Sequence, residues 1–226
     1  MRIKGRQEGR SMIETLGYLA VVIVVAAGIG SLVSSAFSDY KLSKASLQIN
    51  DLASAIIKAS AADDGYDDVV TKINKCISQT KAKTTSENEK DEITAKDDTV
   101  DARECRIIPS TYRVSAGKMY HAFGGEVTIG ITDENDYSTG TSEKLTITFA
   151  GLNKKQCVEL AMKDWLSNKL VDLYAIEINE HSWYWNTYGE DGTNPLPIRR
   201  SVVAGTGEDN GQCSSKKSNT IMWIFN

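Results

Sequence analysis

A run of 24 residues without a charged side chain, Thr15–Ser38, restricts more than any other feature what this chain can fold into. As an α-helix rising about 1.5 Å per residue, the run would measure roughly 36 Å and could cross the hydrocarbon core of a bilayer. The sequence contains no second run of this kind. Residues 15–38 are therefore predicted to form the one membrane segment of the chain.

Basic residues outnumber acids in the first ten residues, with Arg2, Lys4, Arg6 and Arg10 against Glu8 alone. Short segments rich in lysine and arginine stay on the cytoplasmic side of a membrane. The charge distribution thus places the N-terminus in the cytoplasm and everything after residue 38 on the far side.

The residues at the start of the run resemble a processing signal. Gly9-Arg10-Ser11-Met12-Ile13-Glu14, followed by the charge-free run, is similar to the class III signal of type IV prepilins. The resemblance implies that residues 1–9 are a leader, that a prepilin peptidase cuts after Gly9, that Arg10 becomes the methylated N-terminus, and that Glu14 guides assembly. Arg10 departs from the family pattern, because mature pilins usually begin with an apolar residue.

Glu14 also has a physical interpretation that does not depend on this resemblance. If subunits stack their apolar helices in a filament core, the free α-amine of one chain can meet the Glu14 carboxylate of its neighbour, so that two desolvated charges form one pair. Two alternatives remain: an ordinary single-pass anchor with Glu14 at the headgroup level, or a secretory signal ending near Ala36. The length of the apolar region and the glutamate at its start argue against the signal.

The helical pattern continues beyond the membrane segment with a different character. Apolar residues recur at spacings of three and four, the mark of a helix with one buried side: Leu42, Ala45, Ile49, Leu52, Ile56 and Ala59. The other faces are predicted to carry Lys41, Lys44, Gln48, Asp51 and Lys58. One helix is therefore expected over residues 10–62, with its second half packed on a globular domain of residues 63–226.

The later part of the chain shows the alternation of half-buried strands. Residues 126–131 and 144–149 alternate apolar and polar side chains on either side of a turn-rich loop, which predicts an antiparallel hairpin laid on the helix. A short helix is expected over 153–166, and further strands over 171–178 and 220–225, the last one central. The predicted fold class is α+β, a long N-terminal helix packed on an antiparallel sheet.

Four cysteines, Cys76, Cys105, Cys157 and Cys213, all follow the membrane segment. In an oxidising compartment they are expected to form two disulfides, although three pairings are possible. Cys76 and Cys105 bracket the polar segment 81–101, a predicted surface loop, and this proximity favours their pairing. None of the spacings is C-x-x-C, and the loop between the hairpin strands lacks the glycine and final glutamate of a calcium site, so no metal site is predicted.

The soluble part also resembles the pilin fold of type IVb pilins, the toxin-coregulated and conjugative thin-pilus kind. The resemblance rests on the glycine-led strand 123–129, on Gln156-Cys157, and on Cys213 with the closing run 219–225. It implies that Cys157 pairs with Cys213 and that this disulfide bounds a C-terminal region of about 157–213.

Neither composition nor motifs point to an enzyme or a cofactor. The chain has no G-x-S-x-G, H-E-x-x-H or phosphate-loop motif, and its two histidines, His121 and His181, are expected to be surface or packed imidazoles. Its net charge is −4, and it becomes −6 for the part after Gly9, with no basic block. An acidic chain of this kind argues against direct nucleic-acid binding.

An aromatic cluster is the candidate for surface recognition, namely Trp183, Tyr184, Trp185 and Tyr188. Aromatic rings offer large contact areas at little entropic cost, which suits subunit contacts or ligand stacking. The alternative is that Trp183 and Trp185 alternate along a strand and fill the core.

The resemblance implies a function without catalysis. The expected protein is a type IV pilus subunit that is processed by a prepilin peptidase, held in the bacterial inner membrane, and assembled by pilus machinery into an extracellular homo-oligomeric filament for adhesion, DNA transfer or motility. The alternative is a minor pilin, or a membrane-anchored extracytoplasmic binding protein or adhesin.

Overall fold

The computed structural model describes residues 8–61, 65–80, 104–136, 140–165, 172–184, 196–205, 211–216 and 218–226. The segment 81–101, residues 1–7 of the predicted leader, Trp185 and Tyr188 lie outside these ranges. The chain divides into two compact units, Met1–Lys41 and Leu42–Asn226.

Helix α1 spans Glu8–Ser60, and the boundary between the two units falls within it. In the second unit its predicted apolar stripe lies in the core, where Ala45, Ile49, Leu52 and Ile56 are fully buried. Of the residues predicted on the other faces, Lys41, Asp51 and Lys58 are exposed and Lys44 is half-buried. The spacing of three and four therefore selects one face of the helix for packing, as predicted.

The described part of the second unit contains one antiparallel sheet of seven strands, in the order β1-β2-β3-β4-β7-β5-β6. The strands are β1 (Arg113–Ser115), β2 (Lys118–Tyr120), β3 (Glu126–Asp136), β4 (Gly140–Leu152), β5 (Leu173–Ile178), β6 (His181–Tyr184) and β7 (Asn219–Phe225). The closing strand β7 lies between β4 and β5, the central place that its apolar composition predicts. The α+β fold class is confirmed.

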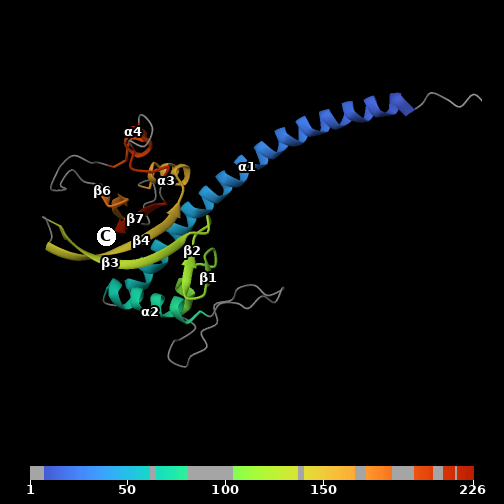
Figure 1. The fold of residues 1–226 in the computed structure, drawn as a ribbon. Coiled ribbons are helices and arrows are strands. Elements are labelled where there is room, and N and C mark those ends of the chain that lie inside the picture. The colour runs from blue at the N-terminus through green and yellow to red at the C-terminus, as the bar shows by residue number, and fades with distance from the viewer. Residues whose placement is uncertain are drawn as a thin grey trace, which may run out of the picture. The chain divides into compact units, whose positions relative to one another are not determined.

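Further helices lie around this sheet (Figure 1): α2 (Tyr66–Gln79), the 3₁₀-helix η1 (Glu104–Ile107), α3 (Lys154–Ala161) and α4 (Arg200–Ala204). Asn153 caps α3, because its side chain accepts a hydrogen bond from the Gln156 amide at 2.9 Å. The Gln156 side-chain oxygen in turn accepts a hydrogen bond from the Asn153 amide at 3.0 Å, which completes a capping box. The helix ends at Ala161 rather than at the predicted residue 166.

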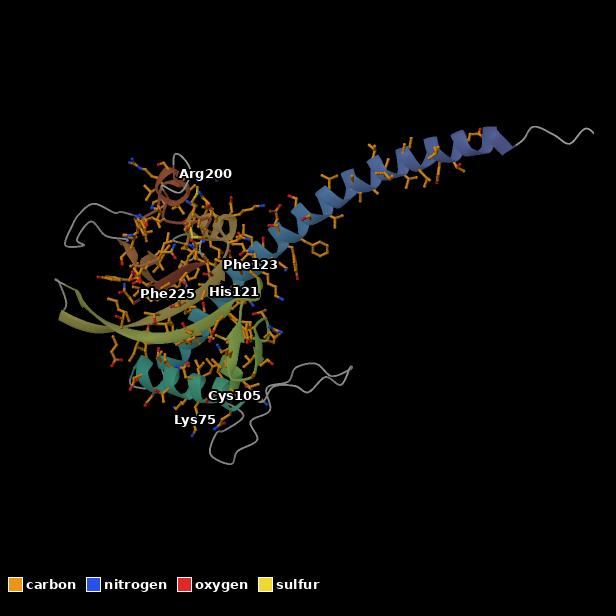
Figure 2. The ribbon with its side chains drawn as sticks, viewed as in Figure 1. Lys75, Cys105, His121, Phe123, Arg200 and Phe225 are labelled. Carbon is orange, nitrogen blue, oxygen red and sulfur yellow. A yellow bond between two sulfur atoms is a disulfide. The ribbon has the colours of Figure 1, made fainter. Side chains whose placement is uncertain are left out.

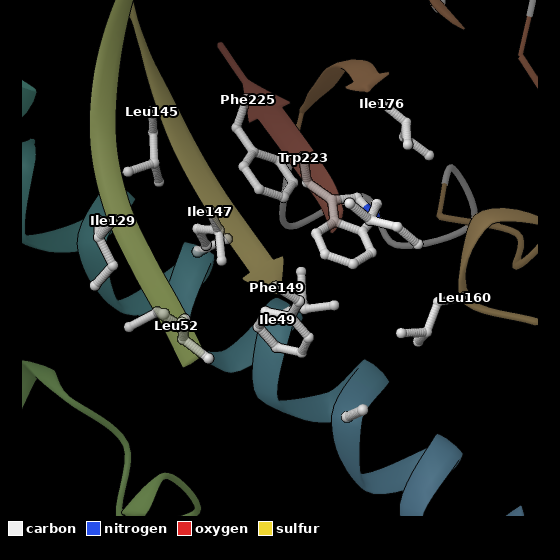
Figure 3. Packing of buried hydrophobic residues seen from close by; sticks show 14 of the residues in the cluster. Ile49, Leu52, Ile129, Leu145, Ile147, Phe149, Leu160, Ile176, Trp223 and Phe225 are labelled. Carbon is white, nitrogen blue, oxygen red and sulfur yellow. The ribbon is translucent and has the colours of Figure 1, made fainter. Parts of the chain in front are cut away.

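Helix α1 packs on one face of the sheet through aliphatic and aromatic side chains. Figure 3 shows Ile49 and Leu52 beside Ile147 and Phe149 of β4, with Trp223 next to them. The rings of Phe149 and Trp223 meet edge to face, with centroids 5.3 Å apart. This arrangement is the one aromatic pairs prefer, and it joins β4 and β7 in the middle of the sheet.

The hairpin is longer than its sequence pattern indicates. The predicted turn-rich loop is mostly strand, since β3 runs to Asp136 and β4 begins at Gly140. The register continues to the pair Asp136↔Gly140 without a shift. Residues with poor strand propensity are held there because each strand satisfies the backbone hydrogen bonds of the other.

One prediction for the polar faces of α1 is wrong. Gln48, expected on an outer face, is 1% exposed. Its Nε2 donates a hydrogen bond to the Thr111 carbonyl at 2.7 Å, and its Oε1 accepts one from the Ala122 amide at 2.8 Å. Both polar atoms of the buried glutamine side chain thus have backbone partners beside β1 and β2, which makes its burial favourable.

Candidate functional site

The first unit presents an almost continuous apolar surface. Large apolar side chains from Leu16 to Phe37 are between 41% and 74% exposed: Leu16, Leu19, Val21, Val22, Ile23, Val24, Val25, Ile29, Leu32, Val33 and Phe37. By length and composition, α1 is also the one helix among the described residues that could cross a membrane. A surface this apolar is unstable in water, so the segment requires lipid or other apolar helices around it.

Glu14 lies at the start of this surface, and its side chain is exposed. From there to Ser38 no other residue carries a charge. Gly9 and Arg10, the predicted cleavage residues, belong to the first turns of α1. Cleavage between them and the assembly role of Glu14 stay predictions.

Two disulfides hold the second unit together. Cys157 on α3 is bonded to Cys213, with Cα atoms 5.8 Å apart, and Cys76 on α2 is bonded to Cys105 in η1, with Cα atoms 5.6 Å apart. All four cysteines are buried. Of the three possible pairings, the structure contains the one that the type IVb resemblance and the proximity argument favour.

A hydrogen-bond network around Asn219 fastens the segment that carries Cys213 to the sheet. The buried Asn219 side chain accepts from the Ser214 amide at 2.7 Å and donates to the carbonyls of Leu152 and Ser214, each at 3.0 Å. Asn179 adds a link by donating to the Gln212 carbonyl at 2.7 Å. Sequence reasoning missed this network, because nothing local distinguishes a buried asparagine from an exposed one.

The aromatic cluster divides between the core and the undescribed part of the chain. Trp183 is 3% exposed and pairs with Ile176 across β5 and β6, so its prediction as a surface contact is wrong and the packing alternative holds for it. The alternation of β6 turns this ring inward. Tyr184 ends β6, while Trp185 and Tyr188 lie outside the described residues, so their surface role stays a prediction.

His121 is packed in the core, one of the two environments expected for it. Its Nδ1 accepts a hydrogen bond from the Phe123 amide at 3.2 Å, so the proton is on Nε2, which donates to the Ala150 carbonyl at 2.8 Å. The imidazole stacks on Phe149 with centroids 4.6 Å apart. A side chain at Gly125 would collide with both the imidazole and the Ala150 carbonyl, so glycine is required there.

This environment predicts a pH-dependent stability. Burial lowers the pKa of His121 from its ordinary 6.5, and the bond to Ala150 opposes that shift only in part. The unfolded chain therefore binds more protons than the folded one just below pH 6.5. Above pH 6.5, His121 should therefore make its full contribution to the free energy of unfolding. As the pH drops from 6.5 to the folded-state pKa of His121, the free energy of unfolding should fall.

Thermal unfolding of the full chain between about pH 5 and 7.5 measures this effect. In the His121→Gln variant, stability should depend less on pH, because the contribution of His121 is absent. His181→Gln is the matched control, since His181 lies on β6 with an exposed side chain. Identical pH profiles for the natural chain and His121→Gln would contradict the assignment.

Among the described residues, no group of three or more His, Cys, Asp and Glu side chains could hold a metal ion. The features of the site are thus an exposed apolar helix bearing one carboxylate, and a disulfide-bonded α+β unit.

Comparison with known proteins shows the family to which this chain belongs. Residues 64–226 match the family model described as PilS N terminal. No curated protein and no solved structure matched the chain. The matched residues make up most of the chain and include α2, the sheet and both disulfides. The chain therefore belongs to the PilS family and is a type IV pilin-related protein of the type IVb class.

Proposed function

We propose that this protein is the structural subunit of a type IV pilus and that it polymerises through the first half of α1 into a surface filament. The exposed apolar surface of residues 16–37, with Glu14 at its start, carries this proposal. Membership of the PilS family supports it, since the family is structural rather than enzymatic.

The same apolar side chains would be covered in two different ways during the life of the subunit. Before assembly they lie in lipid, and in the filament they pack against the helices of other subunits. Since lipid tails are about as apolar as these side chains, helix association in the membrane needs close packing and specific polar pairs rather than a hydrophobic driving force. A polar pair formed only between subunits would set which helices meet and in which register.

Glu14 supplies one half of such a pair. Cleavage after Gly9 frees an α-amine at Arg10, and this amine and the Glu14 carboxylate are opposite charges that each chain brings into the apolar core. An amine from one subunit beside the carboxylate of the next neutralises both, whereas a shifted register leaves a charge buried alone. The filament would then serve adhesion, DNA transfer or motility outside the cell.

Shearing of cells that make the natural chain, followed by intact-mass analysis of the filaments, tests the proposal. We expect this chain to be the main component, lighter by residues 1–9 and with all four cysteines oxidised. A trace amount in filaments built from another protein would indicate the minor-pilin alternative. A chain that keeps its first nine residues and forms no filaments would contradict the proposal.

A further inference from the structure

A basic surface lies over α3 and α4 in this acidic chain. It consists of Lys154, Lys155, Arg199 and Arg200, of which all but the half-buried Lys154 are exposed. The guanidinium of Arg200 is 3.8 Å from the carboxylate of Glu159, which is one turn beyond Lys155 on α3. The two helices are therefore in contact here.

The two lysines of this surface lie at the N-terminus of α3, where a helix normally favours acidic side chains. They occupy the first two positions of α3, and no acid is present in its first turn. The positive end of the helix dipole lies there, and it favours acids over lysines. Lysines at this end do not help α3 to form, so their position suits a partner outside the helix.

An acidic surface lies around the start of α2, formed by Asp67, Asp68, Glu143 and Asp172, all exposed. The position where a Gly65 side chain would begin is 3.4 Å from Glu143 Oε2, which brings Glu143 to the start of α2. Lys72, one turn into α2, and the buried Lys144 are cations near this end. Lys144 Nζ is 2.8 Å from Asn226 Oδ1.

Hydrogen bonds place Asp172 on the same surface. The Tyr66 hydroxyl donates to the Asn226 carbonyl oxygen at 2.6 Å, and Asn226 Nδ2 donates to Asp172 Oδ2 at 2.9 Å. Tyr66 comes directly before Asp67 and Asp68 in the first turn of α2. The four carboxylates thus gather where α2 begins and β7 ends.

The two charged surfaces lie at opposite ends of the second unit. Strand β4 connects them, with Glu143 near its start and Asn153, the cap of α3, directly after its end. Ten residues of strand correspond to roughly 33 Å. Figure 2 shows the labelled Arg200 well apart from the labelled Phe225, which ends β7 beside the acidic surface.

We propose that the basic surface of one subunit contacts the acidic surface of another copy of this chain. A contact between two different patches on opposite ends of a subunit is heterologous, so it repeats without closing and generates a filament. A patch that bound itself would instead stop at a dimer. The inference rests on the proposed filament and adds a specific contact between its globular units.

Charge complementarity also fits the energetics of such a contact. An exposed ion pair contributes little by itself, but two arrays of four charges steer the encounter and fix its register. Like charges brought together in a wrong register are repelled. The apolar helices would then supply most of the cohesion, and the charged surfaces would select the correct neighbour.

Charge reversal in cells that assemble the full chain tests this contact. Arg199→Glu/Arg200→Glu and Asp67→Lys/Asp68→Lys should each lower the yield of sheared filaments by about tenfold or more, since like charges then face each other. A chain that carries all four substitutions restores opposite charges and should recover most of the yield. The amount of oxidised chain in the membrane shows that each variant folds.

Arg106→Glu/Arg113→Glu is the matched control, because it reverses two exposed arginines outside both surfaces. This variant should assemble like the natural chain, and an equal loss of filaments would contradict a specific contact. Normal yields from the single-surface reversals, or no recovery in the combined variant, would also overturn the contact while leaving the filament intact. A natural chain that forms no filaments would overturn the contact and the proposed function together.

Discussion

Cells that make the Glu14→Ala variant are expected to yield no sheared filaments, although the chain still accumulates in the membrane with its leader removed. Without this carboxylate, the α-amine of a neighbouring subunit enters an apolar core with no partner. Removal of one member of a buried ion pair costs about 3–5 kcal/mol. Since every subunit of the polymer would bear this cost, even the lower figure would prevent growth. Cleavage after Gly9 does not need the pair and should continue.

Two further variants separate the charge from other effects. Glu14→Gln keeps the size of the side chain but removes its charge, so it should fail to assemble as Glu14→Ala does. Ser35→Ala is the control, an uncharged change within the same apolar run. Filaments of normal yield from Glu14→Ala would contradict the proposed pairing, and filaments from Glu14→Gln alone would assign the role to hydrogen bonding rather than charge.

The elements that sequence reasoning predicts well are those whose pattern directly reflects burial. The stripe from Leu42 to Ala59 has helical spacing, and the residues of β7 form a short apolar run that suits a central strand. In both cases the side chains are buried by neighbours on one or both sides, so the periodicity of the sequence reports the environment itself.

The features that escaped prediction depend on partners far away in the chain. Gln48 is polar and lies in a helix, and only the backbone groups of Thr111 and Ala122 make its burial favourable. The same holds for Asn219, whose partners include the Leu152 carbonyl. Local propensity carries no information about such partners, which is why buried polar residues are predicted as surface residues.

Strand ends and short edge strands were also missed for a physical reason. Strands β1 and β2 have three residues each, too few to show a period, and they pair across the turn at Ala116 and Gly117. The far end of the hairpin carries residues typical of loops, and its strand geometry comes from pairing alone. Pairing is a property of two segments together, so neither segment predicts it.

Loss of the Cys157–Cys213 disulfide should destabilise the second unit more than most single substitutions would. The bond joins residues 56 positions apart. In the chain-entropy model, such a bond restricts the unfolded chain, and its loss lowers the free energy of unfolding by about 4 kcal/mol. That is a large part of the roughly 5–15 kcal/mol by which a domain is stable. The Cys157→Ala/Cys213→Ala variant should therefore show this loss in the free energy of unfolding, measured by denaturant titration of the full chain in detergent.

The structure also indicates where this loss begins. The amides of Gln212 and Cys213 donate to the carbonyls of Val202 and Val203 in α4, and without the disulfide the segment still has these bonds and those to Asn219 and Asn179 in the sheet region. Hydrogen exchange at Gln212 and Cys213 should accelerate first, while the amides paired between β3 and β4 stay protected.

A matched variant, Cys76→Ala/Cys105→Ala, removes the other disulfide and separates a local effect from a general one. Its bond spans 29 positions between α2 and η1, so it should destabilise the unit without accelerating exchange at Gln212 and Cys213 first. A Cys157→Ala/Cys213→Ala chain that unfolds within about 1 kcal/mol of the natural one would show that this cross-link adds little. In that case the Asn219 network, and not the disulfide, would hold this segment on the sheet.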